Sequence, residues 1–220
     1  MSGHRPLVAL IHATPAAMAP AAAAFADAFP AVRLWNLLDD TLVADAERAG
    51  GLTAALRTRM RTLIGYAIDG GADAVVLSCS MFGPVAAEQY DVPVLSSDAA
   101  LFDAVARLAP GRATVLGPFP AATEDTVARL RAHLGHSTTV SGVVVAGVRE
   151  ALASGQPARA GELIAAAATD AGHADVLVLG QFSLAPARDE AQAALPIPVF
   201  SSPHLAAQAL RARLGGDATP

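Results

Sequence analysis

The stretches "ADAVVLSCSMFGP" (residues 72–84) and "ADVLVLGQFSLAP" (residues 174–186) decide the fold of this chain. They align without a gap at an offset of 102 residues. Two more pairs match at an offset of 105: "VPVLSS" from Val92 with "IPVFSS" from Ile197, and "TPAAM" from Thr14 with "FPAAT" from Phe119. The chain is therefore an internal duplication, and its two halves are expected to share one topology.

Apolar runs alternate with alanine-rich, helix-like segments along the chain. The helix-like stretch from Ala46 to Ile68 has an apolar face marked by Leu52, Leu56 and Met60. Strand, helix, strand order predicts parallel sheets with right-handed crossovers. The sequence thus predicts an α/β fold of two pseudo-symmetric lobes, each with a four-stranded parallel sheet flanked by helices. The eight predicted strands are Leu7–Ile11, Val32–Trp35, Ala74–Leu77, Val92–Leu95, Ala113–Leu116, Val140–Val145, Val176–Leu179 and Ile197–Phe200.

Composition excludes several classes of protein. With 53% hydrophobic and 16% charged residues among 220, the chain is expected to be globular. The net charge is −5 and the basic residues form no stripe along the chain, so nucleic acid is not an expected partner. No apolar run reaches the ~20 residues that span a bilayer, so no membrane association is expected. A single cysteine agrees with a reducing compartment, and we expect a cytoplasmic protein.

All fifteen basic residues are arginine, so the chain has no lysine and mechanisms that need a lysine side chain are excluded. Pyridoxal phosphate enzymes, Schiff-base aldolases and the Walker phosphate loop each need a lysine. The six histidines form no zinc signature, because His133 and His136 have no third ligand at a suitable spacing. No dinucleotide glycine fingerprint is present either. The sequence therefore predicts a protein without cofactor or metal.

Cys79, the only thiol, follows the strand Ala74–Leu77 directly at a predicted helix start. Ligands of parallel α/β sheets bind beyond the carboxyl ends of the strands, and we expect a crevice between the lobes there. Backbone N–H groups at a helix start attract a carboxylate and favour a thiolate. A buried core cysteine is the alternative reading, but the strand-end position between Ser78 and Ser80 favours a functional thiol.

At these residues the sequence resembles the aspartate/glutamate/hydantoin racemase superfamily, which includes arylmalonate decarboxylases and maleate isomerases. The resemblance rests on the Thr14-Pro15 loop, "GADAVVLSCS", "ADVLVLG" and "PVFSS". It implies one catalytic cysteine from each lobe, acting on opposite faces of a substrate without a cofactor. This chain keeps Cys79 but has Gln181 at the second position, and an amide neither accepts nor delivers a proton near neutral pH.

The resemblance also places the other site residues. Backbone N–H groups and hydroxyls at the two strand ends should hold substrate carboxylates, and two first-strand residues should line the crevice. The expected substrate-binding residues are Thr14, Ser80, Met81, Phe119, Gln181, Phe182 and Ser183, with Cys79 catalytic. Asp39 or Asp40 is the best candidate for a missing acid or base and His12 the next, although helix capping is the favoured reading of the aspartates.

We therefore expect a cofactor-independent isomerase or racemase that acts on a small carboxylate- or amide-bearing substrate through Cys79. Two alternatives stay open: a decarboxylase (a lyase) in which Cys79 protonates a carbanion, and a non-catalytic small-carboxylate binding protein. The expected lobes are residues 1–98 with 203–220, and residues 99–202. The resemblance implies that the helix from Pro203 packs on the first lobe and that the protein is a homo-oligomer.

Overall fold

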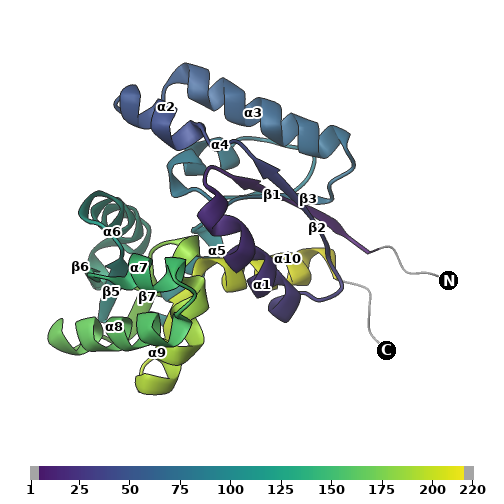
Figure 1. Ribbon diagram of the computed structural model, residues 1–220. Helices are drawn as coiled ribbons and strands as arrows, with labels where there is room; N and C mark the ends of the chain where they lie inside the picture. The colour runs from purple at the N-terminus through teal and green to yellow at the C-terminus, as the bar shows by residue number, and fades with distance from the viewer. Residues whose placement is uncertain (1–4, 216–220) are drawn as a thin grey trace. The chain divides into compact units, whose positions relative to one another are not determined.

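The computed structural model of the protein describes residues 5–215, and Figure 1 shows its helices and strands. These residues form two compact units, residues 5–100 with 206–215 and residues 101–205. Residues 1–4 and 216–220, which belong to the first lobe in our prediction, lie outside the described residues.

Each unit contains one four-stranded parallel sheet, which confirms the predicted fold class. The first sheet has the order β2-β1-β3-β4, with bounds β1 Leu7–His12, β2 Arg33–Leu38, β3 Ala74–Leu77 and β4 Val94–Leu95. The second has the order β6-β5-β7-β8, with bounds β5 Arg112–Gly117, β6 Thr139–Val144, β7 Val176–Leu179 and β8 Val199–Ser201. The two orders correspond strand for strand, so the repeat in the sequence is also a repeat of topology.

Residues 5–98 hold the α-helices α1 Met18–Ala28, α2 Leu42–Arg48, α3 Ala54–Asp69 and α4 Gly83–Ala86, and the 3₁₀ helices η1 Pro15–Ala17 and η2 Ser80–Phe82. The following segment holds α5 Ala99–Leu108, α6 Pro120–Leu134, α7 Val148–Ala153, α8 Pro157–Asp170, α9 Arg188–Ala194 and the 3₁₀ helices η3 Gly135–Ser137 and η4 Phe182–Ala187. The last helix is α10, Ser202–Leu214. No helix within residues 5–215 combines the length and apolar composition needed to cross a membrane.

The predicted helical stretch from Ala46 to Ile68 is wrong as one element, because the structure divides it between α2 and α3. Gly50 and Gly51 lie at the break with φ angles of 72° and 137°. Residues other than glycine rarely adopt such backbone angles, so the glycine pair ends one helix. Thr53 then starts α3, and its hydroxyl oxygen accepts a hydrogen bond from the Leu56 N–H at 3.3 Å.

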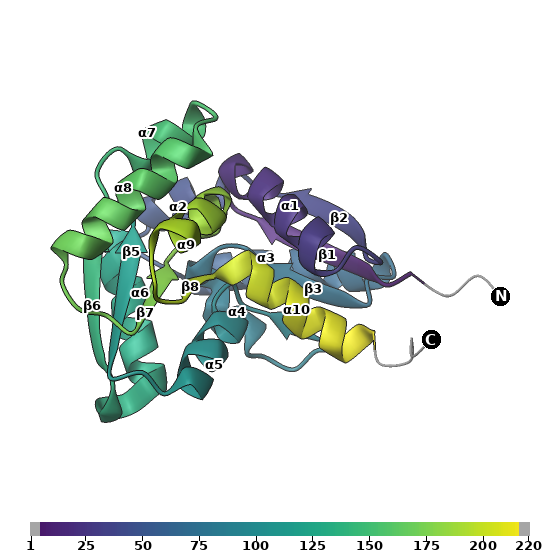
Figure 2. The same ribbon diagram turned by 90° about the horizontal axis from the view of Figure 1, so that it is seen from below.

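Helices cover both faces of each sheet. In the first unit, α2, α3 and α4 pack on one face through a core that includes Ile11, Leu77 and Met60. Figures 1 and 2 show α1 and α10 on the other face of this sheet. In the second unit, α5 and α6 pack on one face through Val105, Val115 and Leu130, and α7, α8 and α9 pack on the other. Strands β3 and β7 are buried at every residue, which explains their continuous apolar runs.

Candidate active site at the carboxyl end of the first sheet

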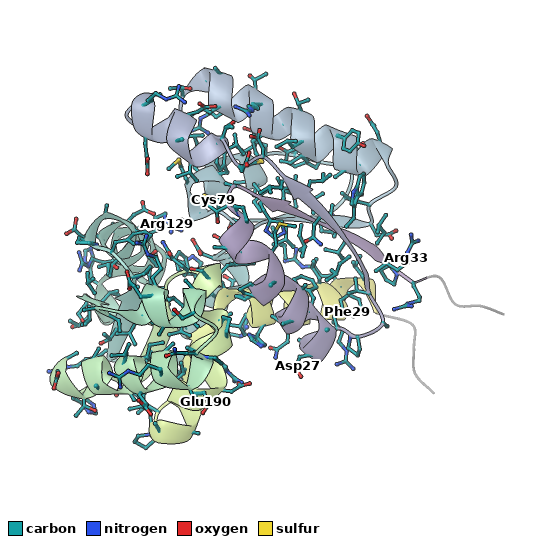
Figure 3. The ribbon with its side chains drawn as sticks, in the orientation of Figure 1. Asp27, Phe29, Arg33, Cys79, Arg129 and Glu190 are labelled. Carbon is teal, nitrogen blue, oxygen red and sulfur yellow. The ribbon has the colours of Figure 1, made fainter. Side chains whose placement is uncertain are left out.

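Cys79 lies just beyond the carboxyl end of β3, where Figure 3 labels it. Its backbone is extended, with φ −109° and ψ 120°, and it is the residue before η2. The preceding Ser78 N–H donates to the carbonyl of Ile11 on β1 at 3.0 Å, so the sheet holds the chain up to the thiol. Cys79 is partly exposed as a residue, and its side chain packs against the core under α2, α3 and α4. The sheet therefore positions the thiol at the end of β3.

Gln181 occupies the same place in the second unit. It is the extended residue before η4, and the preceding Gly180 N–H donates to the carbonyl of Leu116 at 2.9 Å. Gln181 is partly exposed. The two strand ends thus match in backbone geometry and differ in chemistry, with a thiol in one unit and an amide in the other.

The helices that follow Cys79 are short. η2 has three residues and α4 has four. The turn closes when the Phe82 N–H donates to the carbonyl of Cys79 at 3.2 Å. Because a helix dipole grows with the number of aligned peptide units, these helices contribute little field at the sulfur. The stabilisation of a thiolate at this helix start stays a prediction.

A chain of hydrogen bonds runs across the end of the first sheet beside Cys79. His12, the last residue of β1, is completely buried. Its Nε2 lies 2.9 Å from Oδ1 of Asn36 on β2, and its Nδ1 lies 3.0 Å from Oγ of Ser78. Three neighbouring strands are thus joined by polar side chains at the edge where the thiol lies.

Burial lowers the pKa of His12 below its ordinary value of 6.5, and the hydrogen bond to Asn36 opposes that shift only in part. The imidazole is therefore neutral near pH 7. The carboxamide oxygen of Asn36 can only accept, so Nε2 carries the proton and donates to it. Nδ1 is then an acceptor, and the Ser78 hydroxyl donates to it.

Asp39, the first candidate for a missing acid or base, is held by an ion pair. Its Oδ1 accepts from the Arg59 guanidinium at 2.5 Å and from the Thr41 hydroxyl and backbone N–H at 3.1 and 3.3 Å. The N-cap of α2 is Thr41 and no side chain caps the helix, so the prediction that an aspartate caps it is wrong; Asp39 bonds to Thr41 just before the helix instead. Asp40 is exposed.

The other predicted site residues differ in what they can offer. Thr14 is exposed at the end of β1 and its side chain makes no capping bond to η1. Phe119 is 38% exposed at the end of β5. Phe182 is 3% exposed, so only its backbone could meet a ligand. The remaining three, Ser80, Met81 and Ser183, are partly exposed next to the strand ends.

One charged neighbour of the predicted residues was not found from the sequence. The guanidinium of Arg149, on α7, lies 5.7 Å from the ring centre of Phe119. Nothing in the repeat pattern marks Arg149, because its partner in the first half, 105 residues earlier, is Ala44. Within residues 5–215, no group of three or more His, Cys, Asp or Glu side chains could hold a metal ion.

Several solved structures share this fold. The chain is similar to aspartate racemase from Picrophilus torridus (TM-score 0.70, 15% identity, 96% of this chain and 94% of that chain). It is similar to allantoin racemase from Klebsiella pneumoniae (TM-score 0.71, 16% identity, 96% and 88%) and to unliganded arylmalonate decarboxylase (TM-score 0.63, 20% identity, 97% and 94%). At these identities the likeness concerns the fold. No curated protein sequence matches the chain significantly.

The fold and the strand-end residues define a duplicated α/β protein of the kind that binds ligands beyond its parallel strands. The family model described as Asp/Glu/hydantoin racemase matches residues 84–210, more than half of the chain, and the chain belongs to this family. The matched segment contains Gln181 and begins after Cys79. The suspected family resemblance is thereby confirmed.

Proposed function

We propose that the protein is a cofactor-independent isomerase or racemase that acts on a small carboxylate- or amide-bearing substrate through Cys79. The observation that carries the proposal is the position of the only thiol, partly exposed at the end of β3 in a member of the racemase family. Backbone N–H groups and a hydroxyl suited to a carboxylate or amide follow at Ser80 and Met81 and are matched by Phe182 and Ser183 in the repeat.

The chemistry of such a site is proton transfer at carbon. The Cys79 thiolate removes the proton next to the substrate carbonyl group, and the bonding electrons move onto the carbonyl oxygen. Donors at the strand ends stabilise the resulting enolate. The thiol then returns a proton to carbon as the carbonyl re-forms. Gln181 binds the substrate but does not move a proton.

A decarboxylase is the second candidate, and the amide at Gln181 favours it. Loss of carbon dioxide from a malonate-like substrate leaves a carbanion that needs one proton, which a single thiol can supply. Inversion at a stereocentre requires a proton donor on each face of the planar intermediate. The replacement of the second cysteine thus suits decarboxylation, or isomerisation with one protonation.

Exchange of substrate hydrogen in deuterated water tests the proposal. Proton NMR would follow loss of the α-hydrogen signal from a panel of small amino acids, hydantoins and carboxylic acids, with malonates scored for carbon dioxide release. We expect wild-type protein to act on at least one member and the Cys79→Ala variant to lose that activity by more than 100-fold. Full activity in Cys79→Ala would remove the thiol from the mechanism.

Alkylation of Cys79 separates an enzyme from a binding protein. Because it is the only cysteine, iodoacetamide labelling reports one site without background. Fast labelling that malonate or succinate slows supports a reactive thiol in a ligand site. A thiol that labels no faster than a small free thiol, in a protein that still binds the dicarboxylate, would identify a non-catalytic binder.

A further inference from the structure

Strand β2 leaves one edge of the first sheet open. It is the outermost strand in the order β2-β1-β3-β4, and its sequence is RLWNLL. Proteins commonly protect such edges with lysine, proline or a β-bulge. The strand Arg33–Leu38 contains neither residue, and its six register partners on β1 are consecutive, so no bulge interrupts it. The edge can therefore accept another strand.

The hydrogen bonds to β1 show which backbone groups of β2 point outward. The Arg33 N–H donates to the carbonyl of Pro6 at 2.8 Å, and the Asp39 N–H donates to the carbonyl of His12 at 3.0 Å. Because inward and outward residues alternate along a strand, the odd-numbered residues from 33 to 39 bond to β1. The even-numbered residues hold their N–H and carbonyl groups on the open edge, and these are Leu34, Asn36 and Leu38.

A second copy of β2 satisfies all of these groups when the two strands run antiparallel about a two-fold axis at Asn36. In this register Leu34 faces Leu38 of the second copy, and Asn36 faces its own counterpart. Every outward N–H then meets an outward carbonyl, and three N–H groups from each copy give six hydrogen bonds. An axis one residue away in either direction pairs only two of the three residues, so two N–H groups from each copy give four.

The same register buries apolar side chains. On one face of the strand pair leucine meets leucine, and on the other Trp35 faces Leu37 of the second copy. Leu38 is 41% exposed, and Trp35 is half-buried with its ring centre 5.4 Å from that of Tyr66 on α3. Tyr66 itself is 60% exposed. A partner strand would therefore remove apolar surface from water, which favours association.

The charges at the two ends of the strand are complementary about the same axis. Each Arg33, labelled in Figure 3, faces Asp39 of the second copy, so a pair of opposite charges forms at each end of the interface. Within residues 5–215, Arg33 forms no ion pair, and the partners of Asp39, which are Arg59 and Thr41, all bind its Oδ1. Oδ2 of Asp39 is left for another donor. The register that completes the backbone bonds thus also pairs the charges.

The matching edge of the second sheet lacks these features. β6 is also outermost, and by the same alternation its outward residues are Val140, Gly142 and Val144. Thr139 and Val145 stand at the repeat positions of Arg33 and Asp39, so pairing there would join no charges. Glycine at the centre also offers no side chain to bury. Self-complementarity is therefore a property of β2 and not of the repeat.

We propose that the protein forms a two-fold symmetric dimer in which the β2 strands of two copies pair antiparallel, with Asn36 on the axis. The two first sheets then form one continuous sheet with four strands from each copy. A second copy fits because it supplies both the outward leucines and the reversed order of charges that this edge requires. Such a contact closes on itself, so assembly ends at the dimer. The inference gives the homo-oligomer implied by the resemblance an interface, and it does not depend on the reaction catalysed.

Analytical ultracentrifugation at micromolar concentration tests the dimer. We expect a mass twice the 22.2 kDa of one chain. Hydrogen exchange measured on the same sample should be slow at the amides of Leu34, Asn36 and Leu38, which face water in a monomer. On dilution these amides should exchange faster, and the emission of Trp35 should shift to longer wavelength as its ring becomes more exposed. A monomer throughout the micromolar range overturns the inference, including the case in which this edge takes a strand from a different protein.

Two proline variants form a matched pair. Leu38 and Val144 share one repeat position, lie on edge strands and are 41% and 42% exposed. Proline at either position removes an N–H group that its own sheet does not use. We expect Leu38→Pro to be monomeric and Val144→Pro to remain dimeric.

A charge variant tests the register without altering the backbone. Arg33→Glu changes an exposed side chain and places like charges at both ends of the interface. It should raise the dissociation constant of the dimer by about 10-fold. Thr139→Glu, at the matching exposed position of β6, should leave the dissociation constant unchanged.

The outcomes decide between this interface and any other. Fast exchange of the β2 amides in a wild-type dimer, or an undiminished dimer in both Leu38→Pro and Arg33→Glu, locates the contact elsewhere and overturns the inference. Loss of the dimer in Val144→Pro as readily as in Leu38→Pro does the same. Circular dichroism shows which variants are folded, and if either proline variant is not, the comparison of Arg33→Glu with Thr139→Glu decides.

Discussion

The buried His12 should make the first unit less stable as the pH falls below about 6.5. In the unfolded chain its imidazole binds a proton near the ordinary pKa of 6.5, whereas burial lowers the pKa in the folded protein. Between those two values the unfolded state binds more protons, so acid favours unfolding. The stability is complete above the unfolded pKa, is lost as pH falls through this window, and levels off below the folded pKa.

One proton sets the size of the effect. The free energy of unfolding should fall by up to about 1.4 kcal/mol per pH unit within the window. The His12→Gln variant does not titrate, and its amide can still reach toward Asn36. It should lose about 1–2 kcal/mol at pH 8, from the hydrogen bonds of the imidazole, and then show a flatter profile down to pH 5.

Urea unfolding followed by tryptophan fluorescence measures this directly. Trp35, the only tryptophan, lies on β2 beside Asn36, so the signal reports the unit that contains His12. The carboxylates whose pKa is lowered by arginine partners in this unit, Asp45 and Glu88, titrate below their ordinary values of 3.8 and 4.5, outside the range from pH 8 to 5. Parallel profiles for wild type and His12→Gln across that range would refute the reasoning.

Three other substitutions or treatments have expected outcomes. Gly117→Ala should lower the free energy of unfolding by about 1–3 kcal/mol, because the new Cβ meets the buried Thr123. Gly65→Ala, where the backbone is helical and the space is open, should be neutral or stabilising. Urea unfolding followed by circular dichroism measures both, and equal effects would contradict the packing described. Gln181→Cys supplies a second thiol at the repeat position of Cys79 and should raise α-hydrogen exchange of aspartate or glutamate in deuterated water above the low wild-type rate. A wild-type rate of roughly 1 to 1000 per second on either amino acid would instead require another base. Activity should persist in EDTA, and its loss would count against a metal-free mechanism.

The fold was readable from the sequence because two signals agreed. Apolar runs located the eight strands within a few residues, and the run Ala74–Leu77 matches β3 at both ends. The repeat then gave both sheets one topology. The boundary errors have local causes: β4 keeps only Val94 and Leu95 of the predicted run, and β2 extends through Leu38 because its edge position tolerates the polar Asn36.

The site was only partly readable. The amino-acid sequence alone shows a single cysteine at a predicted strand end and Gln181 at its repeat position. The bond between His12 and Ser78 is not, because it joins residues 66 positions apart and depends on the register of two strands. Arg59 was equally hidden as the partner of Asp39, since an ion pair between a loop and a helix leaves no periodic trace.

The helices that follow the fourth strands carry a consequence for folding and ancestry. α5 follows β4 of the first unit, yet its apolar side packs with Val115 and Leu130 of the second. α10 follows β8 of the second unit, yet residues 206–215 belong to the first, where Arg211 donates to the carbonyl of Ala28 at 3.4 Å. The last helix of each half of the repeat therefore belongs mainly to the compact unit of the other half.

This exchange of helices has the connectivity of a domain-swapped dimer whose two copies have been joined end to end. On the ribosome, the first sheet lacks α10 until residues 202–214 emerge, and the second unit, which is continuous, can be complete earlier. In a fragment that ends after α5, the second sheet, which α5 covers in the full protein, would be absent. Two such fragments could exchange their α5 helices and so restore, as separate chains, the arrangement that the duplicated gene now holds in one.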